Sequence, residues 1–349
     1  MQIAVQGDFL LKGDTHAEND FLLQMLLPAL ENRQVSLIFM ASTTRQQQLL
    51  QPYGTVHLLP PPRWLPVNSW AEKWKYRQQV PHFLKKQPTS LLITSRPVAV
   101  HQPQLLIIAT PHAVEQPGFS GKIVVPTNWA ATEMTTLYGI AAEKLQVISA
   151  APPTNSAPAD WETRETTKNS YTDGCEYFIF STAEPAAADL LYLFKAFSVF
   201  KKWQKSSMKL VITNVPEVLL PELETYRYRN DVVLLQNIDH QEILSIVAGA
   251  YSMVYPVPED TTGMPLLSAF ASEVPVITVQ TPALQEIGAE VVLYADAADF
   301  NSMGQQMIQL YKNESLRNNL ALAGKNRVAS SSRQQSSRQL WQVIEGLTS

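Results

Sequence analysis

The stretch YSMVYPVPEDTTGMPLLSAFASEVPVITVQTPALQEIGAEVVLYAD, residues 251–296, carries the clearest strand and helix signals of the chain. Its runs YSMVYP, VPVITV and VVLYA are short and apolar, which is typical of strands buried in a parallel sheet. A loop and a helix separate the first two runs, with Gly263 and Pro265 at the junction. Proline is tolerated in the first turn of a helix, and glycine lets a ligand approach the backbone. The stretch therefore predicts βαβ units with a turn suited to a ligand.

The same alternation of apolar runs and helical periodicity occurs in both halves of the chain. Strands are predicted at 2–6, 35–40, 55–59, 90–94, 105–110, 122–126 and 145–150, and again at 176–181, 209–214, 231–236, 251–256, 274–279 and 291–295. Helical stretches include 17–31, 69–80 and 128–138. Strands that alternate with helices favour a parallel sheet. The predicted fold class is α/β, with two doubly wound, Rossmann-like domains that face each other across a cleft.

Residues 151–173 are rich in Pro, Ser, Thr and Asn and lack a sustained apolar period, so they are predicted to be a linker or long loop. We expect an N-terminal, acceptor-side domain at 1–160 and a C-terminal, donor-nucleotide domain at 170–330. Residues 331–349 contain a helical pattern with an apolar side. This last helix is predicted to pack back on the N-terminal domain.

Composition excludes several classes of protein. Charged residues make up 17% of the 349 residues and hydrophobic residues 45%, which argues against disorder, and the formal net charge of -4 argues against a nucleic-acid partner. The single cysteine, Cys175, leaves no intramolecular disulfide and too few thiols for a structural zinc site. The sequence has neither a signal-peptide pattern nor a run of 18 uncharged apolar residues. We therefore expect a cytoplasmic protein.

The loop at 259–264 has two interpretations. Asp260, Thr261 and Thr262 are suited to cap a helix that starts near Met264, and free amides at a helix start bind anions and hydroxyl-rich groups. An ordinary loop-to-helix junction explains the same residues. The acidic run ADAAD at 295–299 is better explained by a helix cap at Asp299 than by a metal site.

Four segments resemble the family 4 ("group 1") retaining glycosyltransferases, which have the GT-B fold. The run 251–296 is similar to the donor-binding segment of that family, in which a strand leads to an E-G-F-G-L-P-x-L-E-A helix and a G-x-PVI strand. Residues 122–153 resemble the segment that closes the family's N-terminal domain, and residues 177–202 and 231–256 resemble parts of its second domain. The resemblance implies transfer of a sugar from a nucleotide-diphospho-sugar to a hydroxyl acceptor in glycan or cell-envelope biosynthesis. The nucleotide-sugar is then a co-substrate, and neither a metal ion nor another cofactor is implied.

The resemblance also implies a set of site residues. The active-site histidine of the family falls on His112, and the first acid of its E-x7-E motif, which contacts donor sugar hydroxyls, falls on Asp260. Without the resemblance, a lone histidine at a strand end is more often a structural hydrogen-bonding residue. The candidate catalytic residues are His112 and Asp260, and the candidate donor-binding residues are Gly13, Ser181, Thr182, Asn214, Asn237, Glu259, Thr261, Thr262, Gly263, Met264 and Ser268.

Several donor-site positions depart from the family pattern. Ser268 stands where a second acid of the family holds the ribose hydroxyls, and a serine lacks the bidentate, charge-assisted grip of a carboxylate. The family's diphosphate-binding Arg and Lys are absent from STAEPAAADL (181–190), and its Gly-Gly loop is reduced to Gly13-Asp14. Lys12 and Arg96 are possible replacement cations. Two other functions therefore stay open: a binding or regulatory protein of GT-B fold whose donor site has decayed, and, with less support, a sugar-nucleotide epimerase.

Residues 63–86, RWLPVNSWAEKWKYRQQVPHFLKK, combine aromatic and basic side chains. A basic, aromatic amphipathic helix is able to rest on a membrane interface, which suits a lipid-linked acceptor. A surface helix with solvated lysines explains the pattern as well. We expect a nucleotide-sugar donor and a glycan, lipid-linked or small-molecule acceptor, with peripheral membrane contact through 63–86 as a further possibility.

Overall fold

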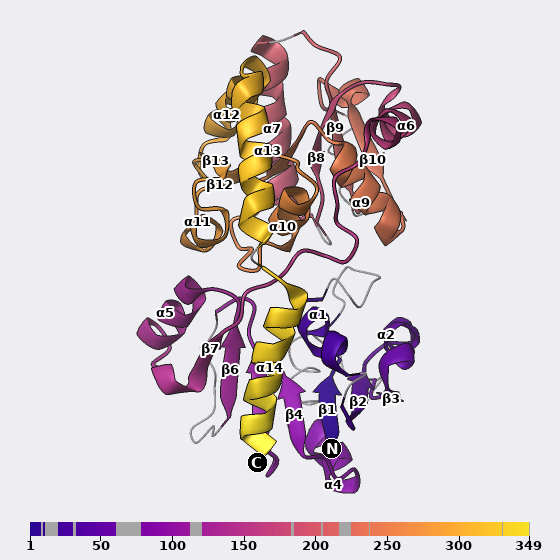
Figure 1. Cartoon of the computed structure of the whole chain (residues 1–349), viewed down its shortest axis with the longest axis vertical. Helices are drawn as coiled ribbons and strands as arrows, with labels where there is room; N and C mark the ends of the chain where they lie inside the picture. The colour runs from indigo at the N-terminus through magenta and orange to yellow at the C-terminus, as the bar shows by residue number, and fades with distance from the viewer. Residues whose placement is uncertain are drawn as a thin grey trace. The chain divides into compact units, whose positions relative to one another are not determined.

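Two parallel β-sheets organise the chain (Figure 1). The computed structural model describes residues 1–7, 10, 20–30, 33–60, 78–111, 121–182, 185–203, 205–215, 225–236, 238–329 and 331–348. The chain divides into a first unit, Met1–Ser149 with Arg333–Ser349, and a second unit, Ala150–Ser332. The predicted pair of parallel α/β domains is confirmed.

The sheet of the first unit has the strand order β3-β2-β1-β4-β5-β6-β7, and all neighbouring strands are parallel. Its strands are β1 (Gln2–Gln6), β2 (Ser36–Ala41), β3 (Thr55–Leu58), β4 (Leu91–Thr94), β5 (Gln104–Ile107), β6 (Lys122–Val125) and β7 (Leu145–Val147). Chain order reverses between β1 and β4, which pair through Ile3 and Leu91. This pair is the topological switch point of the first unit.

The second unit repeats the design with the strand order β10-β9-β8-β11-β12-β13, again all parallel. Its strands are β8 (Tyr177–Phe180), β9 (Lys209–Thr213), β10 (Val232–Leu235), β11 (Ser252–Tyr255), β12 (Val276–Val279) and β13 (Val292–Ala295). Every residue of β8, β11 and β12 is buried, as expected for strands covered on both faces. The switch point lies between β8 and β11.

Helices connect the strands of both sheets. They are α1 (Leu23–Leu26), α2 (Thr44–Leu50), α4 (Val80–Lys86), α5 (Asn128–Thr136), α6 (Trp161–Thr172), α7 (Ala187–Trp203), α9 (His240–Gly249), α10 (Met264–Ala271), α11 (Pro282–Gly288), α12 (Phe300–Lys312), α13 (Glu314–Ala329) and α14 (Arg333–Thr348). Short 3-10 turns are Leu27–Ala29, Gln51–Tyr53, Ala142–Lys144 and Arg229–Asp231. Asp299 caps α12 by accepting a hydrogen bond from the amide of Asn301, so the predicted cap is confirmed. No helix in the part of the chain that the structure describes is long and apolar enough to cross a membrane.

The prediction that all of 151–173 is a linker is wrong for its second half, which forms α6. The Asp160 carboxylate caps this helix by accepting a hydrogen bond from the amide of Thr163 at 2.8 Å. The helix packs on α9 and buries the side chains of Thr167 and Thr172. Because threonines replace aliphatic residues on the packed face, the helix shows little apolar periodicity in the sequence.

Helix α14 packs on α1 of the first unit (Figure 1). Leu340, Trp341 and Ile344 are fully buried, and the Trp341 indole donates a hydrogen bond to the carbonyl of Leu26 at 3.3 Å. The Arg33 guanidinium lies 4.8 Å from the centre of the Trp341 ring. The apolar side seen in the sequence is therefore what joins the end of the chain to the first unit.

Candidate functional site

The candidate site lies where β8 and β11 end, at the switch point of the second sheet. In an open parallel sheet, the connections leave such a pair of strands in opposite directions and open a crevice at their carboxyl ends. Ser181 and Thr182 follow β8 directly, and Tyr255 is the last residue of β11. The loop after β11 leads through Asp260 to α10. The topology thus gathers the predicted residues of 181–182 and 259–264 at one edge.

Tyr255 links the end of β11 to the loop that follows it. Its hydroxyl donates a hydrogen bond to Oδ2 of Asp260 at 3.0 Å. Burial, together with the charge of Asp260, raises the pKa of Tyr255 well above its usual value, so the hydroxyl stays protonated and acts as a donor. Tyr255 is not among the residues predicted from the sequence, although an aromatic hydroxyl at the carboxyl end of a buried strand is a usable signal.

The other oxygen of Asp260 fixes the start of α10. Oδ1 accepts hydrogen bonds from the Thr262 amide and hydroxyl, both at 2.8 Å, and from the Gly263 amide at 3.1 Å. Two amides predicted to be open for a ligand are therefore already paired within the loop. Among the described residues, Oδ2 accepts one hydrogen bond, from Tyr255. A carboxylate oxygen accepts two, so Oδ2 is able to accept a second one from a ligand hydroxyl.

Gly263 is required at the N-cap of α10 for two reasons. Its φ of 60° lies in the left-handed region, which side chains other than glycine rarely adopt. A Cβ at this position would lie 2.7 Å from Cδ1 and 2.8 Å from Cγ2 of Ile287 in α11. The loop therefore packs tightly against α11 at Gly263.

Short polar contacts also join the ends of β8 and β9. The Thr213 hydroxyl donates to Oγ of Ser181 at 3.0 Å, and the Asn214 side-chain amide donates to the carbonyl of Thr182 at 3.1 Å. The Thr182 side chain hydrogen-bonds the Tyr255 hydroxyl. Ser181 and Asn214 thus hold the two strand ends together, and Thr182 extends this network to Tyr255 and Asp260.

This edge of the sheet carries acids and, as the sequence indicated, lacks the Arg and Lys that the family resemblance would place after β8. Asp189 lies in the first turn of α7, and Glu259 is exposed in the loop after β11. Burial, and to a lesser extent the charge of Glu259, raises the pKa of Asp189, whereas a hydrogen bond with the Ala186 backbone opposes the shift. The first lysine after β8 is Lys195, whose ammonium lies 5.5 Å from the centre of the Phe300 ring. A diphosphate at this edge gains no cation from the first turn of α7.

Ser268 lies on α10 and is 5% exposed. Its Oγ is 3.2 Å from Oγ of Ser156, within hydrogen-bonding distance, and either hydroxyl is able to donate. Ser156 belongs to the segment that precedes α6 in the same unit. The position aligned with the family's ribose-binding acid is thus held by a pair of neutral hydroxyls.

Several predicted residues lie outside the described residues. These are His112, Gly13, Asn237, Lys12 and the first part of 63–86, residues 63–77. Thr261 is buried, and Met264 is partly buried at the start of α10. Arg96 is exposed just after β4, at the switch point of the first sheet. Among the described residues, no group of three or more His, Cys, Asp or Glu side chains is placed to hold a metal ion.

Residues 164–327 match the family model for glycosyl transferases group 1. The match includes every strand of the second sheet and the complete contact network of Tyr255 and Asp260. The second unit is therefore similar in sequence to the group 1 glycosyl transferases over most of its length. The sequence-predicted segments 177–202, 231–256 and 251–296 all fall inside the matched range.

Solved glycosyltransferases share the fold of this chain. A glycosyltransferase from Rickettsia africae ESF-5 is 11% identical, with a TM-score of 0.77 over 99% of this chain and 98% of that chain. WaaG, a glycosyltransferase involved in lipopolysaccharide biosynthesis, is 11% identical with a TM-score of 0.77 over 99% of this chain and 100% of that chain. Anabaena Alr3699/HepE, in complex with UDP and glucose, is 12% identical with the same TM-score and the same coverage as WaaG. These likenesses confirm the GT-B fold, and no curated protein matches the chain.

Proposed function

We propose that the chain transfers a sugar from a nucleotide-diphospho-sugar to a hydroxyl acceptor in glycan or cell-envelope biosynthesis, with retention of the anomeric configuration. The observation that carries the proposal is the hydrogen-bonded network at the β8–β11 switch point, which lies inside the part that matches group 1 glycosyltransferases. HepE, a solved structure of the same architecture, holds UDP-glucose in a second complex. The acceptor is a glycan, a lipid-linked molecule or a small molecule.

The residues of the network have separate roles in this proposal. Oδ2 of Asp260 accepts a hydrogen bond from a sugar hydroxyl, while Oδ1 keeps the start of α10 in place. Glu259 is exposed beside it and provides a second acceptor for hydroxyl groups. His112 contacts the reacting sugar, as the family resemblance implies. The nucleotide-sugar is the co-substrate, and the mechanism uses no metal ion.

A second candidate function is a binding or regulatory protein with the same fold. One observation in its favour is that Asp189, Glu259 and Asp260 lie at an edge where a diphosphate needs positive charge. Another is the Ser156–Ser268 pair, which stands where the family resemblance implies an acid that holds the ribose. In this case the domain binds a hydroxyl-rich ligand without transferring it. The two functions differ in whether the bond between sugar and diphosphate is broken.

The test is an incubation of the full chain with a panel of UDP-, GDP-, ADP- and dTDP-sugars, with and without glycan and lipid-linked acceptors. The transferase proposal expects release of a nucleoside diphosphate with one donor and a product whose anomeric configuration, followed by NMR, equals that of the donor. Asp260→Asn keeps the size of the side chain but removes its charge, and it should slow release by at least about tenfold. Binding of a donor without any release supports the second candidate, and epimerisation of the free donor identifies an epimerase.

A further inference from the structure

We propose that the end of the second unit formed by the last turns of α7 and α12 is a docking surface for an anionic lipid membrane. The surface consists of Lys202, Trp203, Lys205 and Lys312, and we call it the lysine–tryptophan tip. Helices α7 and α12 pack along one another (Figure 1). Trp203 and Lys312 are their last residues, and these two side chains are in contact. Membrane docking at this surface is separate from sugar transfer and does not depend on it.

Trp203 is the centre of the tip. Its side chain is 41% exposed, and the Lys312 ammonium lies 4.7 Å from the centre of its ring. The inner edge of the indole packs on Phe200 and Tyr311, with ring centres 6.4 Å and 6.3 Å away. The indole is therefore in contact with Phe200, Tyr311 and Lys312 and still remains exposed to solvent. An indole of this kind, part apolar and part polar, favours the headgroup level of a bilayer.

The tip has a strong local excess of positive charge. Lys202, Lys205 and Lys312 are exposed and make no ion pair within the part of the chain that the structure describes. Beneath them, Lys201 and Lys209 share the single carboxylate of Asp231, which leaves one more positive charge. The three exposed lysines together with Lys201, Lys209 and Asp231 carry a formal charge of +4, in a chain whose net charge is -4. Glu314, which follows shortly after Lys312, is paired with Arg317 and does not offset this charge.

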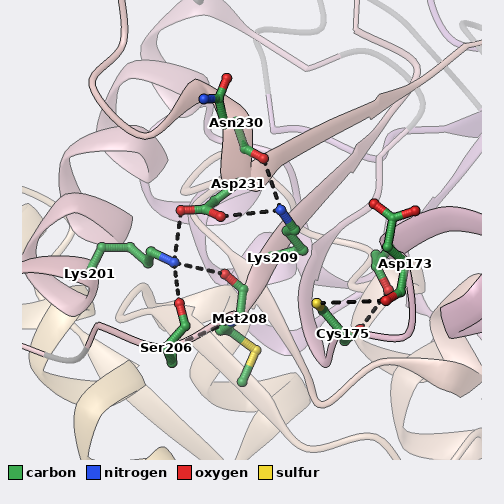
Figure 2. A network of polar contacts seen from close by, with 9 residues as sticks. Asp173, Cys175, Lys201, Ser206, Met208, Lys209, Asn230 and Asp231 are labelled. Atoms are coloured by element: carbon green, nitrogen blue, oxygen red, sulfur yellow. Dashed lines mark hydrogen bonds and ion pairs between the residues drawn. The ribbon is translucent and has the colours of Figure 1, made fainter.

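The loop that carries Lys205 is anchored to the body of the unit (Figure 2). The Lys201 ammonium is buried, donates to the carbonyls of Ser206 at 2.6 Å and Met208 at 3.3 Å, and pairs with Asp231 at 2.8 Å. Lys209 donates to the carbonyl of Asn230 at 2.9 Å and pairs with the same aspartate at 3.2 Å. Because these contacts exist before binding, the loop itself does not have to be ordered when the tip meets a surface.

A lipid surface fits this chemistry better than a nucleic acid does. Lysines near an anionic bilayer each strengthen binding by about fivefold, and a neighbouring tryptophan adds interfacial anchoring. Binding along a nucleic-acid strand needs an extended basic face with many phosphate contacts. The tip instead is a compact group at the end of two helices.

A second exposed tryptophan in the same unit serves as the matched control. Trp161 is 76% exposed at the start of α6, but its neighbours are the acids Asp160 and Glu162. Both tryptophans are therefore exposed, but only Trp203 is surrounded by lysines. Trp161→Ala removes an indole that is more exposed than that of Trp203, and it leaves the tip unchanged.

The test measures co-sedimentation of the full chain with phosphatidylcholine vesicles, with or without phosphatidylglycerol. We expect binding only to the anionic vesicles, weakened by salt. Lys202→Gln with Lys205→Gln should reduce it at least tenfold, and Lys312→Gln and Trp203→Ala should each reduce it several-fold. Trp161→Ala should leave it unchanged. Circular dichroism melting of each variant checks that the fold is retained.

Four results would overturn the proposal. The first is the absence of binding to anionic vesicles by the wild-type chain. The second is equal vesicle binding by the wild type and the Lys202→Gln, Lys205→Gln variant. The third is loss of vesicle binding in Lys85→Gln with Lys86→Gln but not in the tip variants, which would place the contact at the end of α4. Binding of the wild type to duplex DNA but not to vesicles would also assign the tip to another partner.

Discussion

The hydroxyl of Tyr255 donates to Oδ2 of Asp260 at 3.0 Å, and this contact joins the end of β11 to the loop that starts α10. Oδ1 of the same carboxylate holds the amides of Thr262 and Gly263. One aspartate therefore connects a strand end, a loop and a helix start at the switch point of the sheet. The proposed donor site depends on this connection.

Tyr255→Phe tests the connection with a minimal change in shape. The variant removes one hydrogen bond to a charged acceptor in a buried environment, so we expect the free energy of unfolding to fall by about 1.5–3 kcal/mol. Donor binding should weaken in parallel because Asp260 loses a fixed orientation. Calorimetric unfolding and donor titration measure the two effects. If the Tyr255→Phe variant unfolds with the wild-type free energy and binds the donor with the wild-type affinity, the role given to Tyr255 is contradicted.

Gly263→Ala tests the packing of the loop against α11. The variant adds backbone strain at a positive φ, of about 1 kcal/mol, and a contact of 2.7 Å with Ile287. We expect a total loss of stability of about 1–3 kcal/mol. In an Ile287→Ala background the cost of Gly263→Ala should be smaller, because only the strain remains. An equal cost in both backgrounds would show that Ile287 does not restrict position 263.

Asp189 gives a prediction about pH. Burial and the nearby charge of Glu259 raise its pKa above 3.8, so the folded protein holds this proton more tightly than the unfolded chain. The free energy of unfolding should therefore fall as pH rises from 3.8 through the raised pKa and then become constant. Asp189→Asn should remove this contribution, and Glu259→Gln should shift it to lower pH. Urea unfolding across this range measures the slope, and a difference between wild type and Asp189→Asn that does not change with pH would contradict the prediction.

Ser268→Glu tests whether position 268 faces the nucleotide. A glutamate offers a diol two charge-assisted hydrogen bonds, so nucleoside diphosphates should bind about 10- to 100-fold more tightly. Because Ser156 contacts Ser268, the variant is best made together with Ser156→Ala to provide space. Titration calorimetry measures the affinity, and Ser156→Ala alone is the control. Unchanged affinity would mean that this face of α10 does not meet the ribose.

The strands of both sheets were predictable because each is a short apolar run, as in Tyr177–Phe180 of β8. Helix α6 was not, since its buried face uses Thr167 and Thr172 in place of aliphatic side chains. The residues at 259–264 were predicted from the loop-to-helix pattern, but the hydrogen bond between Asp260 and Tyr255 was not. The Ser156–Ser268 contact joins positions 112 residues apart, and no local pattern contains such a pairing.

A calorimetric titration of the full chain with UDP-, GDP-, ADP- and dTDP-sugars tests most directly whether the chain uses a nucleotide-diphospho-sugar. We predict that at least one of these donors binds with a Kd below about 1 mM, a binding free energy more favourable than about -4 kcal/mol. Asp260→Asn should weaken that binding. If no member of the panel binds below about 1 mM, the proposed transferase function is contradicted.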